Sequence, residues 1–161
     1  VLGGALPETI IAPLNWDQSH TLNLSLAYTQ PKNWGFSLIG NFFTGQPYTP
    51  EVNKNTRVTQ NAFPRNSDRK PTIFNMDLRV YKDFEISSSV LTLFLRVNNL
   101  FDSENAVNVY NDSGDPFFTF AKLEAQRINP TLYNNTLDEL YTDPTYFSEP
   151  RRVEIGFGFN F

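Results

Sequence analysis

The feature that most constrains this chain is a strict alternation of apolar and polar residues over five stretches. At 152–161, apolar residues alternate with charged residues, glycine and asparagine. Because successive side chains of a β-strand point to opposite faces, this period of two indicates strands that are apolar on one face only. The pattern predicts sequentially ordered antiparallel strands near 19–29, 34–44, 73–84, 89–101 and 152–161.

The links between these stretches alternate between short and long. Residues 30–33 and 85–88 have hairpin length, whereas 45–72 and 102–150 exceed the ~15 residues usual for loops. In a meander the two kinds of link therefore lie at opposite ends of the sheet. Val107 and Val109 keep the parity of the fourth strand, so we expect it to continue to about Asn111.

The second long loop also carries signals for short helices. Residues 120–128 have a helix-forming composition, and Thr136 and Glu139 have the spacing of a capping box. We therefore expect helical turns within 102–150.

The apolar face has the composition of a surface that contacts lipid. With the short links at one end, Tyr28, Trp34, Phe84 and Phe161 fall at that end, and Phe42, Phe74 and Phe101 near the other. Two aromatic belts around an aliphatic band are typical of outer-membrane β-barrels. Because five strands are too few to close such a barrel, we expect the chain to be part of a larger one. A soluble β-sandwich, whose strands alternate in the same way, is the alternative.

Four segments add a resemblance to a known family. Residues 93–102, LFLRVNNLFD, resemble the V-N-N-L-F-D element near the end of TonB-dependent outer-membrane receptors, and 151–161 resemble their terminal strand. Residues 15–23 and 44–50 resemble two further family segments, and all four occur in family order. The family's fold is a 22-stranded transmembrane β-barrel around an N-terminal plug. By resemblance, residues 1–161 would be the last five strands with extracellular loops 45–72 and 102–150, without the plug domain.

The resemblance also implies a function and a location. The family imports scarce nutrients, namely siderophore-bound iron, cobalamin or glycans, across the outer membrane of Gram-negative bacteria with energy from the TonB complex. The implied partners are the remainder of the barrel and its plug, the barrel-assembly machinery, outer-membrane lipid, and TonB through an N-terminal region that this chain lacks. A passive porin or adhesin barrel, an outer-membrane hydrolase and a soluble glycan-binding β-sandwich are the alternatives.

Three sets of residues are candidates for function. Five apolar residues of the last strand, continuous with lipid-facing wall, would form the barrel-assembly signal: Val153, Ile155, Phe157, Phe159 and Phe161. Six loop aromatics would either stack on a siderophore or sugar or pack the loops together: Tyr48, Phe63, Tyr133, Tyr141, Tyr146 and Phe147. Six polar residues would face the lumen, where they would either line a substrate path or form wall that pairs with the plug: Asp77, Arg79, Arg96, Asn98, Arg152 and Glu154.

Composition argues against several other classes of protein. The chain has no cysteine and a single histidine, His20, so neither thiolate chemistry nor a multi-histidine metal centre is expected. No serine–histidine–aspartate arrangement is evident around His20, and we expect no enzyme and no cofactor. The formal net charge of −4 gives no reason to expect nucleic acid as a partner. Residues 111–115 resemble the start of a calcium loop, but the later ligand positions are missing.

Overall fold

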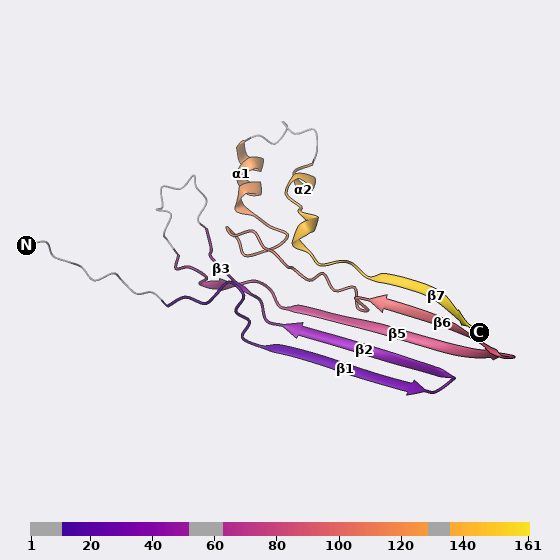
Figure 1. Cartoon of the computed structure of the whole chain (residues 1–161). Coiled ribbons are helices and arrows are strands. Elements are labelled where there is room, and N and C mark those ends of the chain that lie inside the picture. Colours follow the sequence, from indigo (N-terminus) through magenta and orange to yellow (C-terminus); the bar gives the residue numbers. More distant parts are fainter. Residues whose placement is uncertain (1–10, 52–62, 129–135) are drawn as a thin grey trace, which may run out of the picture.

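The chain folds into an open, single-layered antiparallel sheet with a small lobe of loops and helices at one end (Figure 1). The computed structural model describes residues 11–51, 63–128 and 136–161. The strands lie in the order β1 (Thr21–Gln30), β2 (Trp34–Phe43), β5 (Ile73–Ile86), β6 (Ser89–Asn98) and β7 (Arg152–Asn160). The loops carry the two-residue strands β3 (Pro47–Tyr48) and β4 (Asp68–Arg69), helices α1 (Phe120–Ile128) and α2 (Leu137–Leu140), and a 3-10 turn, Pro144–Tyr146.

All five long strands predicted from the alternation are confirmed, in sequential and antiparallel order. Lys32 and Ser87, which have positive φ angles of 58° and 56°, form the two short turns. These turns and the C-terminus lie at one end of the sheet, and the long loops leave from the other (Figure 1). We call these the turn end and the loop end. Strands make extensive contacts only with their immediate neighbours among the described elements.

The register places the apolar residues of all five strands on one face. One row of directly paired residues, from β1 to β7, reads Leu26, Leu38, Leu78, Val97 and Val153. The apolar face is largely uncovered, because the side chains of Leu26, Ile155 and Phe157 are 52%, 82% and 76% exposed. A sheet in water would bury such a face, since each large apolar side chain gains about 1.5–3 kcal/mol on burial.

Aromatic side chains gather at both ends of this apolar face. At the turn end, the rings of Tyr28 and Trp34 lie 5.2 Å apart and those of Phe159 and Phe161 lie 5.5 Å apart. At the loop end, the rings of Phe74 and Phe101 lie 5.9 Å apart. The middle of the face is aliphatic, so the expected arrangement of two aromatic belts holds for these strands.

Lys82 is the one cation on the apolar parity of β5. It lies next to the turn end, where its amine donates to Asn33 Oδ1 and sits 5.9 Å from the centre of the Phe84 ring. A long side chain can thus keep its stem on the apolar face and its charge at the rim.

The expectation that the fourth strand continues to Asn111 is wrong. β6 ends at Asn98, because Asn99 and Asp102 take positive φ angles of 52° and 55° and turn the chain. The Asn99 side chain closes this turn by accepting from Ser103 N (2.9 Å) and donating to Ser103 O (3.0 Å). Asparagine tolerates positive φ angles, and its side chain can form hydrogen bonds with nearby backbone groups. The alternation of apolar and polar residues contains no information on such bonds.

The helices expected in the second long loop are present. Thr136 Oγ1 accepts from Glu139 N at 3.3 Å, and Glu139 accepts in return from Thr136 N, so the capping box is confirmed. Val109, only 2% exposed, and the Tyr110–Tyr146 ring pair at 4.8 Å lie in the interior of this lobe. No helix in the described part of the chain is both long and apolar enough to cross a membrane.

Candidate functional site

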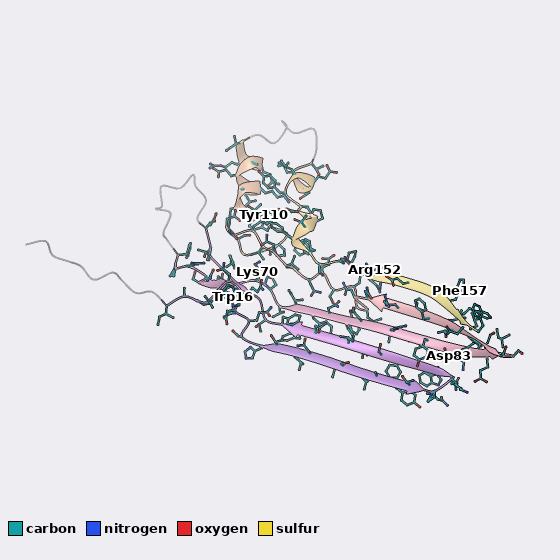
Figure 2. The ribbon with its side chains drawn as sticks, viewed as in Figure 1. Trp16, Lys70, Asp83, Tyr110, Arg152 and Phe157 are labelled. Carbon is teal, nitrogen blue, oxygen red and sulfur yellow. The ribbon has the colours of Figure 1, made fainter. Side chains whose placement is uncertain are left out.

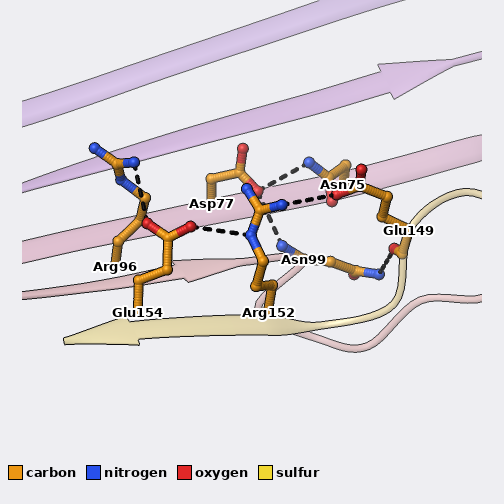
Figure 3. A network of polar contacts seen from close by, with 7 residues as sticks. All are labelled: Asn75, Asp77, Arg96, Asn99, Glu149, Arg152 and Glu154. Carbon is orange, nitrogen blue, oxygen red and sulfur yellow. Dashed lines mark hydrogen bonds and ion pairs between the residues drawn. The ribbon is translucent and has the colours of Figure 1, made fainter.

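The polar face of the sheet carries a charged network across β6, β7 and the segment before β7 (Figure 3). Arg96 Nη1 lies 3.2 Å from Glu154 Oε2, and Arg152 Nε lies 3.0 Å from Glu154 Oε1. Arg152 also reaches Glu149 Oε2 at 3.3 Å. Arg96, Arg152 and Glu154 are half-exposed and Glu149 is mostly exposed, so each pair contributes only about 0–1 kcal/mol to stability. Because these side chains remain partly exposed on the polar face, they are accessible to a further partner.

Asp77 on β5 ties this network to the turn after β6. Its Oδ1 accepts from Asn75 Nδ2 and from the backbone N–H of Asn99, both at 3.0 Å. Asn99 in turn donates from Nδ2 to the carbonyl oxygen of Glu149 at 3.2 Å. Three segments far apart in the sequence are thereby fixed to one another at the loop end of the polar face.

Asn105 takes the place of a neighbouring strand beside β5. Its Oδ1 accepts from Phe74 N and its Nδ2 donates to Phe74 O, both at 2.8 Å. The side chain is 5% exposed, so it satisfies backbone groups where β6 has already turned away. The alternation of apolar and polar residues does not indicate the roles of Asn105 and Glu149. The two consecutive asparagines at 98 and 99 are the sequence feature that could have indicated the turn after β6.

A hollow of about 350 Å³ opens on the polar face beneath the loops. Eight of the eleven residues that line it are polar, among them Asn41, Asn75, Asp77, Asn98 and Glu149. Asn41 pairs directly with Asn75 across β2 and β5, which sets two amides side by side. Amides offer both donors and acceptors, so the hollow suits a hydrogen-bonding group such as a peptide segment or a hydroxyl-rich ligand.

Arg79 lies on the same face without an ion pair to any residue that the structure describes. Its guanidinium carbon sits 5.8 Å above the Phe94 ring, and it pairs directly across the sheet with Arg96. Like charges placed opposite each other disfavour the pairing of their strands. All six polar residues predicted to share a face are therefore on the polar face, and five lie around the network or hollow.

The loop aromatics do not come together as one site. Tyr48 is 8% exposed and Phe63 is 47% exposed, while Tyr133 lies outside the described residues. The Phe147 ring packs at 4.7 Å from Phe117, and Tyr141 accepts at its carbonyl from Tyr110. Tyr141, Tyr146 and Phe147 are half-buried, and their contacts favour packing of the lobe over stacking on a ligand.

The hydroxyl of Tyr48 makes a polar contact within the first long loop. It donates to Asp68 Oδ2 at 3.1 Å, which joins β3 to β4. Burial, followed by the hydrogen bond and negative charge of Asp68, raises the pKa of Tyr48 to about 12. The phenol therefore stays neutral and serves as a fixed donor.

The apolar residues of β7, an edge strand of the sheet, are exposed, as Figure 2 shows for Phe157. β7 pairs with β6 on one side only within the described chain, and Phe161 is 99% exposed. This set therefore lies on an accessible strand edge. At residues 111–115, Tyr110 N donates to Asp115 O at 3.1 Å and Gly114 has a φ of 74°, so the segment is a turn.

Comparison of the chain with protein-family models, with curated protein sequences and with solved structures found no match.

Proposed function

We propose that this chain is the C-terminal wall of a TonB-dependent outer-membrane receptor, an active importer of a scarce nutrient. The strands would be the last five of its barrel, and the long loops would face the outside. Nutrients of the siderophore, cobalamin or glycan class are the expected cargo. The network and hollow on the polar face would then contact the plug or the passing ligand.

The observation that carries this proposal is the uncovered apolar face with aromatics at both ends. In water an exposed face of this size would drive association, whereas in a bilayer it is the favoured surface. The opposite face is polar and charged, which suits the interior of a wide barrel. The position of Lys82 at the turn end agrees with a membrane boundary at that height.

Topology offers the first test of the proposal. In the full-length protein, single cysteines at Ser113 in the long loop and at Ser87 in the short turn would be treated with a membrane-impermeant maleimide on intact cells. We expect labelling at position 113 only, with both positions labelled after lysis. Labelling of both positions on intact cells, or a soluble, monomeric and cooperatively folded isolated chain, would favour the β-sandwich instead.

Energy coupling separates an active importer from a porin or adhesin. Cells carrying the full-length protein would be grown with a siderophore-bound iron source, cobalamin or an oligosaccharide as the limiting nutrient. We expect growth on one of these to be lost equally when the receptor or TonB is deleted. Growth that depends on the receptor and not on TonB would point to a passive barrel.

A further inference from the structure

Two aromatic rings on the polar face cover glycines of neighbouring strands. A single row of paired residues reads Gly35, Tyr81, Phe94 and Gly156 across β2, β5, β6 and β7. A Cβ added at Gly35 would lie 2.6 Å from Tyr81 Cε1, and one added at Gly156 would lie 2.4 Å from Phe94 Cζ. Each ring thus occupies the space where a side chain of the facing residue would stand.

Gly158 lies on the same face of β7 and has no such cover. A Cβ added there would meet no described atom within 4 Å. Its partner on β6 is Thr92, whose hydroxyl is already donated to Asp83 Oδ1 at 2.7 Å. Glycine weakens a strand because it adds no side chain to the face, and an interior glycine often marks a site of close approach. The space above Gly158 is therefore open to a side chain from the other side of β7.

The strand on that other side is not one of the five described here. Because the meander has an odd number of strands, β1 and β7 run in the same direction, so β1 of a second copy could not continue the antiparallel ladder. The polar face of β1 also carries no aromatic residue: Thr21, Asn23, Ser25, Ala27 and Thr29. β7 of a second copy would be antiparallel, but its polar face has no ring either.

We infer that a strand from another part of the full-length protein pairs antiparallel with β7 and sets an aromatic residue directly opposite Gly158. Its ring would fill the space above Gly158, as the Tyr81 ring fills the space at Gly35 and the Phe94 ring the space at Gly156. The contact fixes the register in which the last strand of the sheet is joined, because a slip of one residue would turn the ring to the apolar face. This inference rests on the proposed function, which supplies a barrel for that strand to close.

The test compares valine substitutions on β7 in the full-length protein. Three variants would be folded in membranes: Gly158→Val, Gly156→Val as the reference whose glycine is covered by a ring, and Asn160→Val as the control. The temperature at which each barrel unfolds would be recorded on a semi-native gel. We expect Gly158→Val to lower this temperature at least half as much as Gly156→Val, with Asn160→Val close to wild type. Equal behaviour of Gly158→Val and Asn160→Val would overturn the inference.

Disulfide scanning identifies the residue opposite Gly158 and covers the case where Gly158→Val does not fold. A cysteine at position 158 would be combined with single cysteines along each polar-face position of the first strand of the full-length barrel. We expect the efficient cross-link at a position whose native residue is Phe, Tyr or Trp, and replacement of that aromatic by alanine to restore Gly158→Val. A small native residue there would overturn the inference. A failed labelling test would instead remove the proposed function itself.

Discussion

Asparagine side chains complete the backbone hydrogen bonding at the loop end of β5. Asn105 pairs with both polar groups of Phe74, at a point that the sheet pattern leaves without a strand. A buried amide that loses such partners costs about 1–3 kcal/mol.

Replacing Asn105 by leucine should therefore free the Phe74 amide. We expect hydrogen exchange at that amide to accelerate at least tenfold in the full-length protein, because about 1.4 kcal/mol corresponds to a factor of ten in an equilibrium constant. Asn108→Leu, at an exposed position of the same loop, is the matched control and should leave the exchange unchanged. Equal protection in the Asn105 variant would show that another group pairs with Phe74.

Tyr48 gives the first loop a dependence on alkaline pH. Its pKa is about 12 in the folded loop against an ordinary value of 10.0, so the folded state holds the proton more tightly. The resulting stabilisation is fully present below pH 10 and is lost as the pH rises through 12. We expect a tyrosine absorbance titration to show one phenol ionising near pH 12, and Tyr48→Phe to remove that step. A titration unchanged by Tyr48→Phe would contradict the assignment.

At the scale of strands, the two faces should respond very differently to a charge. Leu78 is in the central row of the apolar face, and Asn75 is on the polar face of the same strand. Arginine at Leu78 should destabilise a lipid-embedded barrel by about 2–4 kcal/mol, whereas arginine at Asn75 should cost much less. Urea titrations of the full-length protein folded in lipid vesicles measure both. Equal losses would mean that the apolar face does not contact lipid.

Strand positions were predictable because a period of two is a property of the sequence alone. The face of Asp77 or Arg96 followed from parity, and the register then brought them onto a shared surface. The end of β6 was not predictable in this way, since it depends on bonds between Asn99 and Ser103. Likewise, the role of Asn105 depends on loop geometry that places it beside Phe74, which no local pattern encodes.

For the whole molecule, Phe161 is the residue whose loss should separate assembly from stability. Phe161 is 99% exposed and touches the ring of Phe159, so it adds little to the folded sheet. As an apolar anchor on an open strand edge, it suits recognition by a machine that adds strands. Deleting Phe161 from the full-length protein should lower the amount assembled in the outer membrane several-fold while leaving the unfolding temperature of assembled protein unchanged.

Trp16→Ala, which removes an exposed aromatic that precedes β1, is the control for the loss of an apolar surface group. It should leave assembly at the wild-type level. If the assembled fraction of the Phe161 deletion also unfolds at a markedly lower temperature, the residue acts in the wall and not as a signal.

The neighbour-only contacts of the strands have a consequence for how such a protein can change over generations. Each long strand in the described part of the chain contacts chiefly its neighbours in the sheet, so each strand interface is a nearly independent unit, as in repeat proteins. Deletion of one hairpin, such as β5 with β6, removes its own interface and the two that flank it, brings β2 beside β7, and keeps every remaining strand in its direction. Growth in steps of two strands is therefore open to this architecture, whereas a change of one strand would reverse the direction of all that follow.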